Sequence, residues 1–250
     1  MGIVDWGRRL LCDHLVGLSP KAFLDSLRRN HYEFVAREFN RSSRHKWSSV
    51  GLPDSPRDFE DLVTLFELSS LNRGVIRQDF DEAALLFRTV RSLPAPRGVE
   101  IGRAAGGSTL LLAVAVGPGG KLLSIDLAPP DDGLLVEVLN RAHLLDRVEL
   151  VVGDANRFER NEQFDFVLID GDHTYEGARK DHNRWGKLVR PGGFVVHHDM
   201  GNSRNLATPL AELARLRQDI LTRQREQLEL LAEAGSMVVF RRRSSSWVGV

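Results

Sequence analysis

From Gly98 onward, short β-type runs alternate with stretches whose apolar residues recur at helical spacing. Seven runs have strand character: GVEI, KLLSID, RVELVVGD, FDFVLID, GGFVVHHD, EQLELLAEA and SMVVFRR. Most are separated by the helical stretches STLLLAVAV, DDGLLVEVLNRAH, TYEGARKDHNRWGKLV and TPLAELARLRQDI. This alternation predicts an α/β fold, a mostly parallel sheet with helices on both faces. The last two runs meet at Ala234-Gly235 without a helix, so we expect an antiparallel hairpin there.

Residues 1–95 differ from this pattern and are predicted to form a helical N-terminal extension, or lid. Ser19-Pro20 is a helix start, and apolar residues return at helical spacing in DFEDLVTLFELSSL and DFDEAALLFRTVRSL. The breaker-rich LPAPRG then leads into the α/β domain, which we place at residues 96–243. The remaining residues, 244–250, form a tail that we expect to be frayed.

Composition limits the partners and the compartment. The chain has 34 basic and 34 acidic residues, so no net charge directs it to nucleic acid or to a membrane surface. No stretch approaches the roughly 18 apolar residues of a membrane span. Cys12 is the single cysteine, which excludes an intramolecular disulfide and favours a reducing cytoplasm. We therefore expect a cytoplasmic protein with a small-molecule partner, and we leave open whether it is a homo-oligomer.

Three strand ends carry residues suited to a nucleoside-like ligand. Gly102 and Gly106 follow the first strand and Ser108 opens a helix, so backbone N–H groups can approach a ligand closely. Their spacing differs from G-x-G-x-x-G, which counts against NAD. Asp126 ends the second strand, where an acid can bind both ribose hydroxyls, and Asp154 ends the third, where it can receive an adenine amino group. A plain turn or a helix-capping acid explains each motif alone, but all three converge on the carboxyl edge of the sheet.

Two further strand ends carry acids and imidazoles. The stretch FDFVLIDGDHTYEG places Asp170, Asp172 and His173 directly after a buried strand, and LVRPGGFVVHHD ends in His198-Asp199. Charged groups are costly to bring near a core unless something pairs with them. The groups after Ile169 therefore either cap the next helix and face water, or hold a metal and move a proton.

Together these motifs resemble the class I S-adenosylmethionine-dependent methyltransferases over about residues 70–242. IDGDHTYEG and LVRPGGFVVHHD are similar to methyltransferase family 24, near the metal-dependent sugar O-methyltransferases of macrolide and aminocoumarin biosynthesis. The resemblance implies a Rossmann-like seven-stranded sheet with strand order 3-2-1-4-5-7-6. It also implies S-adenosylmethionine as cofactor, and its cofactor-binding positions carry over to Glu100, Gly102, Gly106, Ser108, Asp126, Asp154, Ala155 and Asp170.

In that family, a divalent metal is bound by the acid that ends strand four and by two adjacent residues that end strand five. By position in this sequence, these ligands are Asp170 and the pair His198-Asp199. Such a metal would hold the acceptor oxygen and lower the pKa of its hydroxyl. Carboxylates suit Mg²⁺, but the family more often has two carboxylates where this chain has His198-Asp199, and imidazole fits Mn²⁺ or Co²⁺ better. A role for His198 beside a metal-bound water stays open.

The same resemblance suggests a general base. His173 sits where related metal-dependent enzymes carry theirs, and imidazole titrates near neutrality. Asp172 could orient that ring or serve as base itself, and the alternative for His173 is a solvated residue beginning the next helix. His197 points to the opposite face of its strand from His198 and is predicted to be a packed core histidine.

We therefore expect S-adenosylmethionine-dependent O-methylation of a small-molecule hydroxyl, with a natural-product sugar as the favoured acceptor. The alternatives are a metal-independent methyltransferase in which Asp172 or His173 works alone, a non-catalytic nucleoside-binding partner subunit, and an NAD-dependent oxidoreductase. The intact set of Asp170, His173 and Asp199 argues against the non-catalytic alternative. The N-terminal helices and loops would build the acceptor pocket, but they contain no motif that identifies the acceptor.

Overall fold

A computed structural model describes residues 52–66, 75–130, 132–200 and 211–250. The predicted helix at Ser19-Pro20 and the single cysteine lie outside these ranges. In chain order the elements are η1 (Phe59–Phe66), α3 (Phe80–Arg91), β1 (Arg97–Ile101), α4 (Gly107–Ala115), β2 (Lys121–Asp126), α5 (Asp132–Arg141), η2 (Leu145–Arg147), β3 (Val148–Val152), η3 (Ala155–Arg157), β4 (Phe164–Ile169), α6 (Tyr175–Gly186), β5 (Val189–His197), α7 (Ala211–Arg223), β6 (Leu228–Ala234) and β7 (Met237–Arg242).

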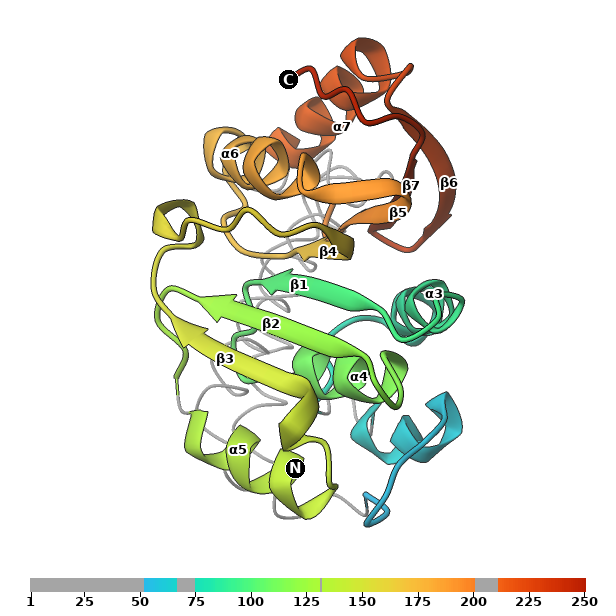
Figure 1. The fold of residues 1–250 in the computed structure, drawn as a ribbon, viewed down its shortest axis with the longest axis vertical. Helices are drawn as coiled ribbons and strands as arrows, with labels where there is room; N and C mark the ends of the chain where they lie inside the picture. Colours follow the sequence, from blue (N-terminus) through green and yellow to red (C-terminus); the bar gives the residue numbers. More distant parts are fainter. Residues whose placement is uncertain (1–51, 67–74, 131, 201–210) are drawn as a thin grey trace, which may run out of the picture.

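The seven strands form one sheet in the order β3-β2-β1-β4-β5-β7-β6 (Figure 1). Pairs β3–β2, β2–β1, β1–β4 and β4–β5 are parallel, and β7 runs antiparallel to both β5 and β6. The predicted strand order and the predicted hairpin at Ala234-Gly235 are both confirmed. Parallel pairing brings the carboxyl ends of β1, β2, β3, β4 and β5 to one edge of the sheet, and the motif residues follow these ends.

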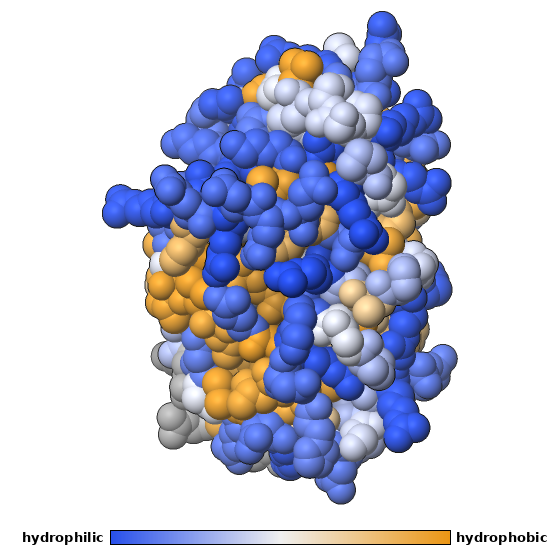
Figure 2. Space-filling model, in the orientation of Figure 1, coloured by the Kyte–Doolittle hydropathy of each residue, from blue (hydrophilic) through white to orange (hydrophobic). Residues whose placement is uncertain are grey.

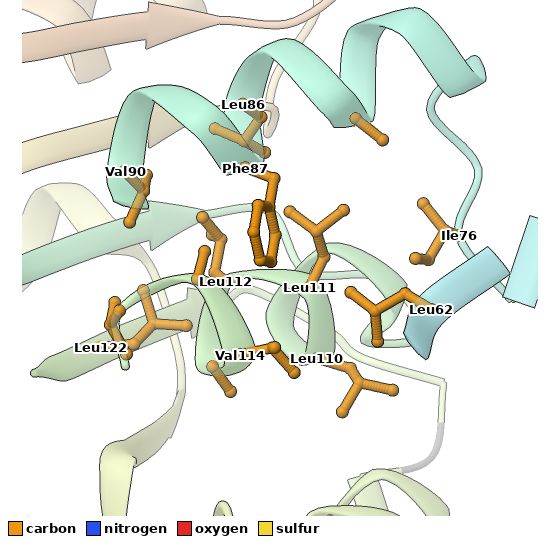
Figure 3. Close-up of a cluster of buried hydrophobic side chains, with 14 of the residues drawn as sticks. Leu62, Ile76, Leu86, Phe87, Val90, Leu110, Leu111, Leu112, Val114 and Leu122 are labelled. Atoms are coloured by element: carbon orange, nitrogen blue, oxygen red, sulfur yellow. The ribbon is translucent and has the colours of Figure 1, made fainter. Parts of the chain in front are cut away.

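Helices cover both faces of the sheet, as strand–helix alternation predicts. The core on one face includes side chains of α3, α4 and α5, and the core on the other includes side chains of α6 and α7. Helix α4 has no charged residue, and all nine of its residues are buried. Figure 3 shows Leu111 and Leu112 of α4 beside Phe87 of α3, and Leu110 and Leu62 of η1 belong to the same buried cluster. This packing fixes the start of α4 against the sheet, where the glycine-rich loop ends.

Two expectations need correction. The segment DFEDLVTLFELSSL is predicted to be an α-helix, but its described part forms the 3₁₀ helix η1. The tail over 244–250 is not frayed, so that prediction is wrong. The Trp247 ring lies 5.1 Å from the His182 ring, and the Val250 side chain is only 6% exposed. Asn183 Nδ2 donates to Val250 O at 3.1 Å, so the end of the chain packs against α6.

Within the described ranges, no helix combines the length and the apolar character needed to cross a membrane.

Candidate functional site

The glycine-rich loop after β1 lies against the end of β4. Gly102 has φ +85°, and a Cβ at this position would collide with the Asp170 carbonyl oxygen. Gly106 has φ +87° and is the N-cap residue of α4. Only glycine adopts this backbone region without strain and allows so close an approach. The loop therefore turns sharply into α4 and leaves the backbone N–H groups of the helix start near the carboxyl edge.

Glu100, a predicted cofactor residue, is fully buried beneath this loop. Its oxygens accept hydrogen bonds from Ser108 Oγ at 2.5 Å, Thr109 Oγ1 at 2.6 Å and Ser124 Oγ at 2.6 Å. Burial raises the pKa of the carboxyl, and the three hydroxyls oppose that rise. Glu100 thus ties β1 to β2 and to the start of α4, and Ser108 contributes to this network. Contact of either residue with a cofactor stays a prediction.

The acids that end β2 and β3 lie beside the loop. Asp126 accepts from Ala104 N and from Ala128 N, both at 2.8 Å. Each carboxylate oxygen has a second lone pair, so Asp126 keeps acceptor capacity for ribose hydroxyls. Asp154 accepts from Asn156 N at 2.9 Å and caps the 3₁₀ turn that begins at Ala155. The three strand ends therefore meet as predicted.

An apolar surface accompanies these acids. Leu127, directly after β2, is 71% exposed, and Val152, the last residue of β3, is 62% exposed. Figure 2 shows apolar side chains gathered over the part of the sheet toward which β1, β2 and β3 point in Figure 1. An edge with acidic hydrogen-bond acceptors beside exposed apolar side chains suits a nucleoside, which has hydroxyls and a flat aromatic base.

The ends of β4 and β5 form a second cluster. His173 Nε2 lies 3.5 Å from Asp170 Oδ1 and 3.8 Å from Asp199 Oδ2. This nitrogen is buried and has no hydrogen-bond partner among the described residues. One ligand atom from each of these three residues lies within 4.8 Å of the others, a spacing that could hold a metal ion. Asp199 has φ +57°, an uncommon backbone region for a residue other than glycine and one that is frequent at functional sites.

His198 also lies in this cluster, as predicted, and both of its ring nitrogens contact carboxylates. Nδ1 lies 3.1 Å from Asp170 Oδ1 and 3.6 Å from Asp199 Oδ2, and Nε2 lies 3.1 Å from Glu82 Oε2. The structure thus places four of the predicted residues together. Their partner Glu82 on α3 was not predicted, although the D-x-x-E pattern Asp79–Glu82 at the start of a helix is a recognisable capping signal.

Gln78 is a second residue that the sequence did not reveal. Its Nε2 donates to Asp170 Oδ2 at 3.4 Å, and the side chain is only 6% exposed. Its Oε1 is buried and meets no hydrogen-bond donor in the described ranges. A buried amide oxygen of this kind usually has a donor, so Gln78 adds an unsatisfied acceptor to the cluster.

Mutual contacts set the charges of the cluster. Burial opposes ionisation of Asp170, but the charge of His198 and the contacts of Asp170 with both histidines outweigh burial and lower its pKa. Burial likewise opposes charging of His198 and His173, but the neighbouring carboxylates raise the pKa of both rings. For Glu82, burial is outweighed by His198 and Ser236, which lower the pKa to about 2. Asp170, Glu82 and the two rings thus stabilise one another's charged forms.

Asp172, which was predicted to orient the His173 imidazole or to serve as the base, lies at the start of α6. It is exposed, and its Oδ1 accepts from Thr174 N at 2.8 Å. Thr174 is the N-cap residue of α6, so the Asp172 carboxylate lies at the start of that helix. The structure therefore brings Asp170, His173, His198 and Asp199 together and leaves Asp172 beside them, in contact with the helix start.

Arg103, inside the glycine-rich motif, also escaped the sequence analysis. Its side chain is buried and pairs with Asp132 at 2.5 Å, while Nη1 donates to Ser124 O at 3.0 Å and to Val151 O at 2.8 Å. These contacts hold the loop to β2 and β3 and to the start of α5. The sequence pattern offers no signal for this role, because a loop arginine is usually solvated.

Residues 99–200 match methyltransferase family 24, described as a methyltransferase domain. Caffeoyl-CoA O-methyltransferase 1 of Eucalyptus globulus is 27% identical over 167 residues, which cover 63% of this chain and 67% of the plant protein. Catechol O-methyltransferase of Mycobacterium tuberculosis is 34% identical over 109 residues, which cover 42% of this chain and 48% of that protein. The chain thus spans between about half and two thirds of the length of these two relatives.

Among solved structures, the O-methyltransferase from Bacillus cereus in complex with SAH has the same fold. It aligns with a TM-score of 0.54 and 19% identity, over 94% of this chain and 96% of that chain. At 19% identity, this similarity shows a shared fold and nothing about substrate or activity.

Proposed function

We propose that the chain is a class I S-adenosylmethionine-dependent O-methyltransferase that methylates a small molecule with two adjacent hydroxyls and uses a divalent metal. Asp170, Asp199 and His198 would hold the metal, and His173 would take the acceptor proton. The meeting of these four side chains at the carboxyl edge carries this proposal: His198 Nδ1 lies 3.1 Å from Asp170 Oδ1 and 3.6 Å from Asp199 Oδ2, and His173 Nε2 lies 3.5 Å from Asp170 Oδ1.

The donor set fits a divalent ion. Two carboxylates supply hard oxygen ligands, and His198 Nδ1 lies 3.1 Å from Asp170 Oδ1 and 3.6 Å from Asp199 Oδ2. Imidazole nitrogens beside these oxygens favour Mn²⁺ or Co²⁺ over Mg²⁺. When bound, such an ion supplies a positive charge that holds the acceptor hydroxyl and lowers its pKa.

The chain's own groups perform the remaining tasks. The loop from Gly102 to Gly106 and the carboxylate of Asp126 would hold the cofactor against the sheet edge. Asp170 belongs to both sites, because it ends β4 beside Gly102 and also contacts the two histidines. His173 would remove the hydroxyl proton as the oxygen attacks the sulfonium methyl. Methyl transfer then depends chiefly on alignment of the oxygen, the methyl carbon and the sulfur.

The relatives favour a catechol-type acceptor. Their names specify caffeoyl-CoA and catechol, which both carry two hydroxyls on neighbouring ring carbons. Two adjacent oxygens can bind one metal together, which would fix the reacting hydroxyl. A natural-product sugar, favoured by the motif resemblance, presents a similar oxygen pair and is the second acceptor class that we propose to test. Cytoplasmic location and the absence of nucleic-acid or membrane partners stay predictions from Cys12 and the balanced charge.

Titration calorimetry and a methyl-transfer assay test this function together. We expect binding of S-adenosylmethionine and S-adenosylhomocysteine but not of NAD, and methylation of catechols that a chelator abolishes and Mn²⁺ or Co²⁺ restores. Asp170→Asn and Asp199→Asn should lose turnover and still bind S-adenosylhomocysteine. Methylation of sugars alone would change the acceptor class, and full activity in excess chelator would favour the metal-independent alternative. Binding of NAD without any response to S-adenosylhomocysteine would reject the function.

A further inference from the structure

Glu82 is a buried carboxylate at the edge of the proposed metal site. It lies in the first turn of α3 and is only 3% exposed. An ionised group is costly to bury without strong partners, so its contacts indicate what it does. Its pairing with His198 spans 116 positions of the sequence.

One oxygen of Glu82 binds the β6–β7 turn. Oε1 accepts from Ser236 N at 2.6 Å and from Ser236 Oγ at 2.7 Å. The same Ser236 Oγ lies 3.3 Å from Asp199 Oδ1 and has one hydrogen to share between the two carboxylates. Glu82 is thus linked to the carboxylate that ends the β5 region through a single serine.

The other oxygen of Glu82 faces His198. Oε2 accepts from Asp79 N at 2.8 Å, which fixes the carboxylate at the helix start, and it lies 3.1 Å from His198 Nε2. An ionised carboxylate only accepts hydrogen bonds, so the proton of this contact is on Nε2. The opposite nitrogen, Nδ1, then points toward Asp170 and Asp199, at 3.1 Å and 3.6 Å from their oxygens.

We propose that Glu82 is a positioning residue that orients His198 so that Nδ1 serves as a metal ligand. Histidine ligands in proteins are commonly oriented in this way, through a hydrogen bond from their second ring nitrogen to a carboxylate. Where this chain replaces a carboxylate of the resembling family by His198, Glu82 on α3 supplies the partner that an imidazole ligand needs. The inference rests on the metal site of the proposed function.

A double-mutant cycle tests the proposal by calorimetry with Mn²⁺ in the presence of S-adenosylhomocysteine. Glu82→Gln keeps the size of the side chain and an acceptor for Ser236 but removes the charged acceptor of His198 Nε2. We expect its Mn²⁺ affinity to fall about 10- to 100-fold, with S-adenosylhomocysteine affinity unchanged. In a His198→Asp background no imidazole needs orienting, so Glu82→Gln should leave Mn²⁺ affinity unchanged or raise it. His198→Asp alone should shift preference from Mn²⁺ toward Mg²⁺.

The outcomes separate the two proposals. If wild-type protein binds S-adenosylhomocysteine but no divalent ion, the metal part of the proposed function fails and this inference fails with it. If wild type binds Mn²⁺ and Glu82→Gln binds it equally well, only the inference fails. An equal loss of affinity in both backgrounds, with a lower melting temperature, would assign Glu82 to joining α3 and the hairpin and would also overturn it.

Discussion

At the scale of single residues, the position of His173 beside Asp170 is consistent with a role as the general base. Its Nε2 is buried, lies 3.5 Å from Asp170 Oδ1 and makes no hydrogen bond within the described part of the chain. We predict that His173→Ala lowers turnover about 10²- to 10⁴-fold, the usual contribution of general-base catalysis, with little change in Mn²⁺ affinity. Turnover assays and calorimetry measure the two quantities. Loss of Mn²⁺ binding would instead make His173 a ligand, and a larger turnover loss in Asp172→Asn would move the base to Asp172.

Asp126 is the residue with the clearest predicted cofactor contact. We expect Asp126→Ala to weaken S-adenosylhomocysteine binding by about 1.5–3 kcal/mol, the usual range for lost hydrogen bonds to a charged group. Because Asp126 also accepts from Ala104 N and Ala128 N, part of this loss would come from a looser loop. Asp126→Asn keeps acceptor capacity and should lose less in the same titration. Equal binding by wild type and Asp126→Ala would remove this residue from the cofactor site.

At the scale of elements, α4 decides how firmly the glycine-rich loop is held. Leu110 lies in this helix and is completely buried. We predict that Leu110→Ala lowers the free energy of unfolding by about 2–5 kcal/mol, because it leaves a cavity in a packed core. Chemical denaturation measures this loss. The exposed Leu127 provides the matched control, since Leu127→Ala should change stability by no more than about 0.5 kcal/mol.

At the scale of the whole molecule, a buried pair of histidines joins α6, β5, the residue that follows α7 and the tail. His182 Nδ1 lies 2.9 Å from His197 Nε2, and His182 Nε2 lies 2.7 Å from Gln224 Oε1. Burial lowers the pKa of His182 to about 4. Burial, together with repulsion from a protonated His182, lowers the pKa of His197 well below its usual value. Both rings are therefore neutral in the folded protein near neutral pH, as expected for a core histidine at position 197.

This pair should make folding stability depend on pH. Between pH 6.5 and 4 the unfolded chain binds protons that folded His182 excludes, so stability is lost as pH falls, by up to about 1.4 kcal/mol per pH unit for each histidine. We predict that His182→Gln reduces this slope in denaturation curves recorded from pH 7 to pH 4.5. His143→Asn, at an exposed histidine, is the control and should keep the wild-type slope. An unchanged slope in His182→Gln would contradict the assignment.

The sequence by itself determined the sheet and the positions of most site residues. Periodicity distinguishes strands from helices, and strand order followed from the resemblance carried by the strand-end motifs. Asp126, Asp154, Asp170 and Asp199 could be grouped from the sequence because parallel strands align their carboxyl ends, so a residue directly after a strand reaches the same edge. This logic depends only on local pattern and on sheet geometry.

Only the tertiary structure decided which groups contact these acids from elsewhere in the chain. Glu82 meets His198 across 116 positions, and Trp247 packs against His182 although the tail has the composition of a frayed end. Arg103 is buried because the ends of β2 and β3 offer it carbonyl oxygens. Such contacts depend on the spatial positions of distant segments, and no local periodicity encodes them. Side-chain partners in the site therefore come from packing, whereas the edge on which the site lies comes from the strand pattern.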